Sequence, residues 1–279
     1  MVGECRSFEI DGMGPLGKPI KDIISCQNTY IVYKDSNDSI KYYTVDYNDW
    51  PNSFGEIQNR VSHWESITNM IFRKKQAYEI KCILAEAYTR ILDNRNYLLA
   101  IDIINYAVNR IKSEGNEILK QYYAISALFC SVFVMLLIFL SKLNKDFIVG
   151  KFGIFEYEIW LIMLFGGIGS FVFVILQLRS YTPDIVIGKK IHIIDGCIRV
   201  FYGIVSGLVV ALGIKSNFIL GFIGTIDKNI FLSAFLGLIA GASDLFIPNL
   251  VKQAESSIKL DAEGKDRIIT QAVSKKETE

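Results

Sequence analysis

The chain has 279 residues, of which 51% are hydrophobic and 21% charged, and its formal net charge is +1. A nucleic-acid-binding protein normally carries a basic surplus, so this balance argues against nucleic acid as a partner. Apolar residues are concentrated in residues 121–250, between a polar stretch, 1–120, and a charged stretch, 251–279. This division indicates a membrane protein with a soluble domain.

Residues 1–52 predict a loop followed by a β-hairpin. Two β-rich runs, 29–33 and 40–47, are separated by turn-forming residues at 35–39. A lone hairpin is marginally stable in water, so we expect it to pack against the helices that follow.

Residues 53–118 predict three soluble helices. Ser53 and Glu56 have the spacing of a capping box, in which each side chain bonds a backbone N–H of the first turn. Apolar residues then recur at intervals of three and four in 57–71, 77–92 and 97–112, as in amphipathic helices. We expect the third helix to end near residues 114–115.

The second and third of these helices resemble a single tetratricopeptide repeat. The resemblance depends on six positions: Leu84, Ala85, Tyr88, Ala100, Ile104 and Ala107. It implies a protein-binding surface that includes Tyr88, Tyr97, Ala100 and Ile104. A generic helical hairpin is the alternative, because stacked repeats usually need at least three units and only one is visible.

Four apolar segments predict transmembrane helices at about 121–141, 158–179, 192–214 and 230–250. The first two contain uncharged runs of roughly 20 residues, the length that crosses a bilayer. The apolar stretch 218–226 either lengthens the third span, re-enters the membrane or lies in the interface.

The expected fold is therefore an integral membrane, all-α bundle of four transmembrane helices with a small N-terminal cytosolic α+β domain. The expected parts are a β-hairpin region, a soluble helical region, a transmembrane domain and a charged cytosolic tail, at 1–52, 53–118, 119–250 and 251–279 respectively.

The third and fourth apolar segments combine charges with small residues. Asp195 and Arg199 begin a row along the third segment, and Asp244 ends a similar row along the fourth. The small residues of the two rows, which suit close helix packing, are Gly203, Gly207 and Ala211 in the third and Ser233, Gly237 and Gly241 in the fourth. We predict that these rows contact each other and that Arg199 pairs with both acids. The cluster then serves an ion or proton pathway or a gate, or it only holds the bundle in register or lies at headgroup level.

Seven residues of these segments form a recurring pattern: Asp195, Arg199, Gly237, Gly241, Ser243, Asp244 and Pro248. In this respect the chain resembles a group of poorly characterised bacterial four-span membrane proteins, with Asp at positions 195 and 244 where that pattern has Glu. The resemblance implies a membrane module attached to varied soluble domains, and it implies no activity.

An even number of spans places both termini on one side of the membrane. Near the spans, eight Lys and Arg residues lie on the side of the termini and five on the opposite side. The positive-inside rule therefore favours an inner-membrane protein with both termini in the cytoplasm.

The sequence indicates no catalytic or metal chemistry. Its five cysteines and two histidines are scattered, and it contains no P-loop, dinucleotide-binding, zinc-protease or nucleophile-elbow motif. We therefore expect no enzyme, no cofactor and no metal site.

Three functions remain open. The first is a receptor-effector whose cytosolic domain controls an oligomerising or ion-permeable module, such as a bacterial stress or phage-defence effector. The second is a membrane-anchored adaptor that recruits proteins through its helical hairpin, and the third is a transporter accessory subunit. The expected partners are the lipid bilayer, further copies of the chain and a cytosolic protein.

Overall fold

The computed structural model describes residues 8–45, 53–215, 230–243, 248–249 and 252. The chain divides into two compact units, which are described in turn. Unit 1 comprises Met1–Tyr122 with Thr182–His192, and unit 2 comprises Tyr123–Tyr181 with Ile193–Glu279.

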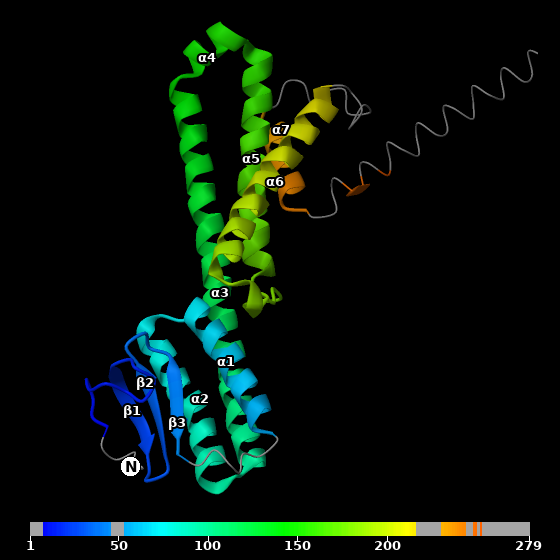
Figure 1. Cartoon of the computed structure of the whole chain (residues 1–279). Coiled ribbons are helices and arrows are strands. Elements are labelled where there is room, and N and C mark those ends of the chain that lie inside the picture. Colours follow the sequence, from blue (N-terminus) through cyan, green and yellow to red (C-terminus); the bar gives the residue numbers. More distant parts are fainter. Residues whose placement is uncertain (1–7, 46–52, 216–229, 244–247, 250–251, 253–279) are drawn as a thin grey trace, which may run out of the picture. The chain divides into compact units, whose positions relative to one another are not determined.

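Unit 1 contains a three-stranded antiparallel sheet (Figure 1). Its strands are β1 (Ile20–Cys26), β2 (Tyr30–Asp35) and β3 (Ile40–Thr44), in that order. The predicted hairpin corresponds to β2 and β3, which pair in regular register from Tyr30↔Thr44 to Lys34↔Ile40. The additional strand β1 was not predicted, and its pairing with β2 is interrupted by two register shifts.

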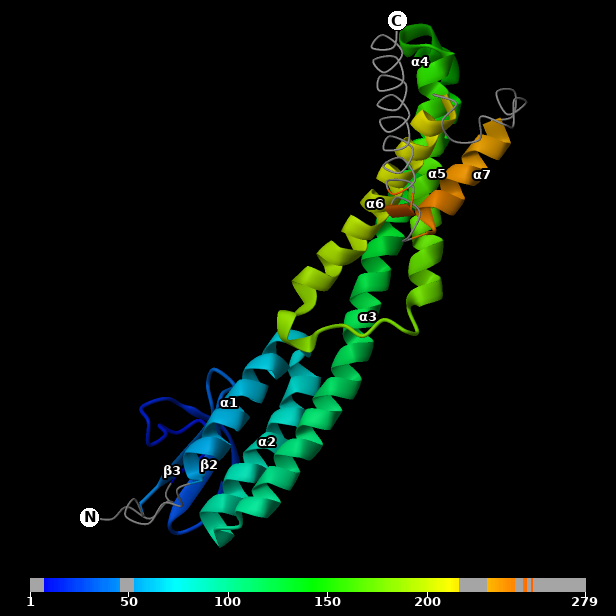
Figure 2. The same cartoon turned by 90° about the vertical axis from the view of Figure 1, so that its right-hand side faces the viewer.

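The helices of unit 1 begin with α1 (Phe54–Ile71) and α2 (Lys74–Asn94). Both lie side by side with the first half of α3 (Tyr97–Leu143), as Figure 2 shows. Ser53 has helical backbone angles and makes no side-chain capping bond, so the predicted capping box is not formed. Apolar side chains from these helices and from β2 and β3 form one buried core.

The segment Thr182–His192 belongs to unit 1 although it follows α5 in the chain. Its short 3-10 helix η2 (Ile185–Ile187) inserts Ile185 into the unit 1 core. The Asp184 side chain accepts a hydrogen bond from the Val186 N–H, and the buried His192 ring lies 2.9 Å from the Asp184 carbonyl oxygen. The connection between two apolar helices is therefore part of the unit 1 core.

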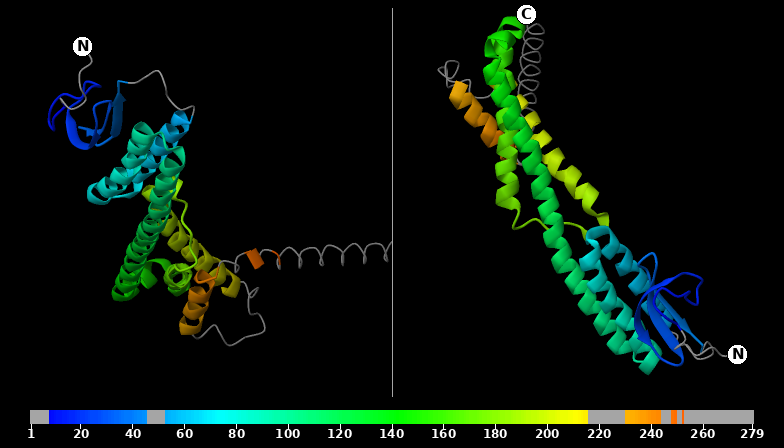
Figure 3. Two further views of the ribbon diagram at one scale, coloured as in Figure 1. Left: turned by 90° about the horizontal axis from the view of Figure 1, so that it is seen from below. Right: turned by 90° about the vertical axis from the view of Figure 1, so that its left-hand side faces the viewer.

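The secondary-structure elements of unit 2 are all helices among its described residues. It contains the second half of α3, α4 (Lys145–Phe152), α5 (Ile154–Gln177), most of α6 (Lys189–Lys215) and α7 (Ile230–Gly241). Figure 3 shows α3 as one continuous helix. The predicted end of the third soluble helix near residues 114–115 is therefore wrong, because α3 continues without a break into the apolar segment.

Three helices are long and apolar enough to cross a membrane, namely α3, α5 and α6. They coincide with the first three predicted spans. The described part of the fourth is α7, which has 12 residues and is thus about 18 Å long. Residues 244–247 and 218–226 lie outside the described residues. The molecule is thus a mostly helical protein with a small sheet, a composition compatible with a multi-pass membrane protein.

Candidate functional site

Asp195 and Arg199 lie one helical turn apart near the beginning of α6. They line an open hollow of about 440 Å³ in unit 2, together with three tyrosines and one isoleucine. The full lining is Tyr123, Tyr181, Asp195, Ile198, Arg199 and Tyr202. We call this cavity the tyrosine hollow. Its walls come from α3, from the residues after α5 and from α6, so three parts of unit 2 contribute to it.

Aromatic rings fix the position of the Arg199 guanidinium. Its central carbon lies 3.9 Å from the centroid of the Phe173 ring on α5 and 5.7 Å from that of Tyr202 on α6. A guanidinium over an aromatic face gains about 0.5–2 kcal/mol, more when it is shielded from water. Arg199 therefore links α5 to α6 while lining the tyrosine hollow.

Tyr123 and Tyr181 form a second aromatic contact at the hollow. Their rings stack with centroids 4.5 Å apart and an interplanar angle of 19°. Burial raises the pKa of Tyr181, and the negative charge of Asp195 raises it further. Tyr181 therefore stays neutral in the physiological range and can donate a hydrogen bond from its hydroxyl.

The predicted pairing of Arg199 with Asp244 concerns a residue outside the described part of the chain. It remains a prediction, and the described residues of the cluster are Asp195 and Arg199.

The glycine ridges of α6 and α7 both face α5. A Cβ built on Gly203 of α6 would lie 2.5 Å from the Gly166 carbonyl oxygen of α5. One built on Gly207 would lie 2.7 Å from the Ile162 carbonyl oxygen. On α7, a Cβ at Gly237 would lie 2.6 Å from the same Ile162 oxygen, and one at Gly241 would overlap the Gly166 oxygen. Each of these glycines therefore packs closely on the α5 backbone, a partner that was not predicted, and the direct contact between the two rows stays a prediction.

The other small residues of the two rows are also buried. Ala211 of α6 joins a cluster with Ile162 of α5 and Ala240 of α7, and Ser233 is buried near the start of α7. The residue types were thus correctly associated with close packing, while their common partner, α5, was not predicted.

The predicted partner surface of the helical hairpin is buried in unit 1. Tyr88, Ala100 and Ile104 belong to its core, and Tyr97 packs against that core while its hydroxyl donates to Glu56 Oε2 at 2.6 Å. The buried Tyr88, Ala100 and Ile104 side chains are therefore not accessible to a partner protein, whereas Tyr97 is only partly buried. Partner binding by this hairpin stays a prediction.

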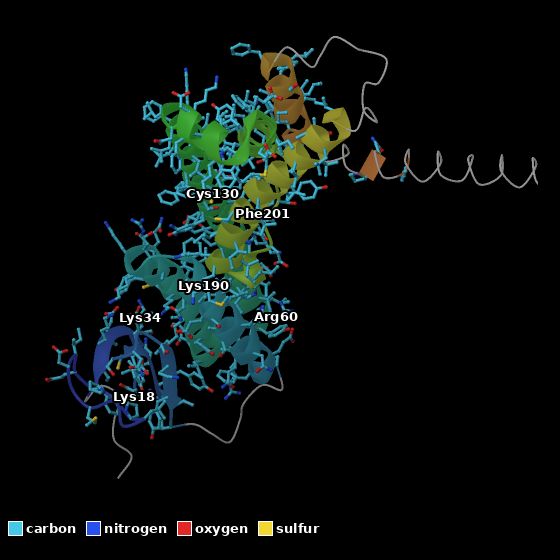
Figure 4. All side chains as sticks on the ribbon, turned by 90° about the horizontal axis from the view of Figure 1, so that it is seen from above. Lys18, Lys34, Arg60, Cys130, Lys190 and Phe201 are labelled. Carbon is cyan, nitrogen blue, oxygen red and sulfur yellow. The ribbon has the colours of Figure 1, made fainter. Side chains whose placement is uncertain are left out.

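Sequence reasoning missed two buried lysines in unit 1, Lys34 on β2 and Lys81 on α2. Lys34 Nζ donates to the Cys82 sulfur at 3.2 Å and lies over the Tyr78 ring (Figure 4 labels Lys34). Lys81 Nζ donates to the Asp38 backbone carbonyl and lies 3.4 Å from the Asp38 carboxylate. Periodicity assigns both lysines to positions that face water, so no signal in the sequence distinguishes them from exposed lysines.

Cys130 on α3 and Cys197 on α6 approach each other within unit 2, with their sulfurs 3.1 Å apart. Both side chains are partly buried. Among the described residues, no group of three or more His, Cys, Asp or Glu side chains is placed to bind a metal ion.

Comparison with protein-family models, with curated proteins and with solved structures finds no match for this chain. Function must therefore be argued from the geometry above.

Proposed function

We propose that this protein is a non-enzymatic, multi-pass membrane protein in which unit 1 binds a partner or signal and controls an oligomerising or ion-permeable module. The module comprises four spans, with α7 as the described part of the fourth, and lies in the inner membrane with both termini in the cytoplasm. A bacterial stress or phage-defence effector has this organisation of sensor and membrane module.

The observation that supports this proposal most directly is the continuity of α3. Ala100 and Ile104 are buried in the unit 1 core, while residues 123–143 of the same helix belong to unit 2. An unbroken helix of 47 residues transmits a displacement along its length, because its backbone hydrogen bonds leave no hinge. A change in unit 1 packing can therefore move the first apolar helix.

A second connection supports the same reading. Ile185 is buried in the unit 1 core, and α6 begins four residues later at Lys189. The α5–α6 connection is thus short and anchored, whereas a passive membrane anchor would need only one attachment. Two of the three long apolar helices are in this way tied to the soluble core.

The experiment interrupts α3 within the last turns that belong to unit 1. Glu117 is exposed, so Glu117→Pro removes a helical hydrogen bond there without opening a core, and Glu117→Ala is its matched control. We expect wild type and Glu117→Ala to depolarise the membrane of expressing cells, as read with a potential-sensitive dye, and Glu117→Pro to lose most of this effect. An inert membrane at high wild-type expression, or equal depolarisation by Glu117→Pro, would contradict the proposal.

A membrane-anchored adaptor is the second candidate, and one observation favours it. The loop before β1 exposes three large apolar side chains, Ile10, Met13 and Leu16, each more than half accessible. They offer a partner-binding surface in place of the buried helical hairpin. An adaptor needs its spans only for attachment. Fusing unit 1 to a foreign anchor would therefore preserve the function of an adaptor and abolish the function of a receptor-effector.

A further inference from the structure

The tyrosine hollow presents one negative and one positive side chain to the same space. Asp195 and Arg199 are four residues apart on α6, a spacing that places their Cβ atoms about 5–6 Å from each other. Arg199 is positioned by the Phe173 ring, and its planar guanidinium carries N–H donors of the kind that bind phosphate oxygens. A ligand that matches this arrangement carries both charges a few ångströms apart.

The hollow lies where apolar segments begin and end. Tyr123 is near the start of the apolar run of α3, Tyr181 follows α5 by four residues, and Asp195 is in the second turn of α6. In a bilayer, tyrosines at such positions occupy the headgroup level. The candidate ligand is therefore one that is concentrated at this depth.

The surface beside the hollow is apolar and exposed. Ile198, which lines the hollow, is 57% exposed, and its neighbours on α6, Ile194 and Phe201, are 54% and 66% exposed (Figure 4 labels Phe201). On a helix that crosses a membrane, such side chains contact acyl chains. A ligand with a charged head in the hollow and apolar tails along α6 would satisfy both surfaces.

We propose that the tyrosine hollow binds a zwitterionic phospholipid headgroup, with the chemistry of phosphatidylethanolamine. The phosphate accepts hydrogen bonds from the Arg199 guanidinium, and the primary ammonium donates to the Asp195 carboxylate beside the tyrosine rings. An anionic headgroup without an ammonium would place its charge near Asp195, and a simple cation would be repelled by Arg199. The opposite charges of a phosphoethanolamine group match both side chains. This site is independent of whether the membrane module conducts ions.

The test is native mass spectrometry of the full chain released from detergent micelles, with phosphatidylethanolamine, phosphatidylglycerol or phosphatidylcholine added at equal concentration. We expect phosphatidylethanolamine to be retained about tenfold more than phosphatidylglycerol, a ratio that corresponds to about 1.4 kcal/mol. Phosphatidylcholine, whose quaternary ammonium has no N–H donor for Asp195, should bind less well than phosphatidylethanolamine. Asp195→Asn and Arg199→Gln should each remove most of the preference, whereas Lys142→Gln, an exposed cation in the last turn of α3, should keep it.

Competition with soluble phosphoethanolamine distinguishes binding of the lipid headgroup from binding of the free compound. If millimolar phosphoethanolamine reduces lipid retention by wild type, the headgroup is the recognised part. Equal retention of the lipids by wild type, or unchanged preference in Asp195→Asn, would overturn the proposal. Binding of soluble phosphoethanolamine with no retention of the lipid would overturn the lipid assignment. Because Arg199→Gln alters a packed contact, Asp195→Asn and the competition on wild type decide the result if that variant does not fold.

Discussion

Charged side chains inside unit 1 form a connected polar cluster between the sheet and α1 and α2. Glu65 of α1 accepts a hydrogen bond from the Ile40 backbone N–H at 2.8 Å, and its carboxylate lies 4.0 Å from Lys81 Nζ. Lys81 in turn bonds Asp38, whose carboxylate also accepts a hydrogen bond from Lys21. Buried ion pairs contribute little net stability, but removing one partner leaves the other charge buried and unpaired, which destabilises the fold. The cluster thus specifies how the β2–β3 turn meets the helices.

Glu65 gives this cluster a measurable pH dependence. Burial raises the pKa of the Glu65 carboxyl above its ordinary value of 4.5, and the Ile40 N–H and Lys81 oppose that rise only in part. A raised pKa in the folded state means that folding favours the protonated form. The free energy of unfolding therefore includes a contribution that is complete below pH 4.5 and is lost as the pH rises through the folded-state pKa.

We expect Glu65→Gln, which keeps an oxygen acceptor but cannot ionise, to gain stability relative to wild type as the pH rises above about 4.5. Urea unfolding of the full chain in detergent at pH 4 to 7, followed by tryptophan fluorescence, measures this difference. The matched control is Glu117→Gln, because Glu117 is exposed and its removal changes no buried charge. A pH-independent difference between wild type and Glu65→Gln would show that burial does not govern this carboxyl.

The buried charges also show why residue-scale prediction from sequence has a limit. On α2, Lys81 stands in an amphipathic pattern in which charged residues ordinarily face water. Its burial depends on the Asp38 carbonyl and carboxylate, which are 43 residues away in sequence. Conversely, Tyr88 and Ile104 matched positions of a repeat that binds partners, but three helices and a sheet bury them here. Periodicity identifies a face of a helix and cannot identify what covers it.

The element that organises the described part of unit 2 is α5. Its Gly166 contacts Gly203 and Gly207 of α6 and Gly241 of α7, and its Gly169 approaches the Leu238 carbonyl of α7. Small residues let backbones approach closely in the membrane, where helix association depends on packing. The sequence predicted helices at all three places and the small residues of α6 and α7. It could not identify the pairing, because a glycine row fits any helix whose backbone it can reach.

A substitution at the centre of this contact tests it. A Cβ on Gly166 would overlap the Gly203 carbonyl oxygen and lie 2.9 Å from Gly207 Cα, so α6 must move away. We expect Gly166→Leu to destabilise the protein by about 3 kcal/mol, as overpacking against backbone does, and to lower the apparent Tm in detergent by roughly 10 °C.

The control is Gly150→Leu on α4, where an added Cβ would meet nothing within 4 Å. It adds the same apolar side chain without closing a helix contact, and we expect its apparent Tm to stay within about 1 °C of wild type. If both variants had the same apparent Tm, the close packing of α6 on α5 would not determine the stability of unit 2.

At the scale of the whole molecule, the number of spans determines which side of the membrane each terminus faces. The three helices long enough to cross, α3, α5 and α6, would by themselves place the N-terminus and the residues after α6 on opposite sides. The described α7 extends about 18 Å, less than the roughly 30 Å of a hydrocarbon core, so its length alone does not complete a fourth crossing. The distribution of basic residues near the spans favours a fourth crossing that returns to the side of the N-terminus.

We therefore predict that the two termini react with reagents from the same side. Single cysteines introduced as Val2→Cys, Lys145→Cys or Glu277→Cys, each in a variant without the five native cysteines, would be labelled with a membrane-impermeant maleimide before and after the membrane is opened. Lys145 lies at the start of α4, between the first two long helices, and serves as the marker of the opposite side. The cysteines at positions 2 and 277 should be labelled under the same one of these two conditions, and the cysteine at position 145 under the other. Joint labelling of 277 and 145 would mean three crossings, and unit 1 could then no longer share a compartment with the charged C-terminal residues.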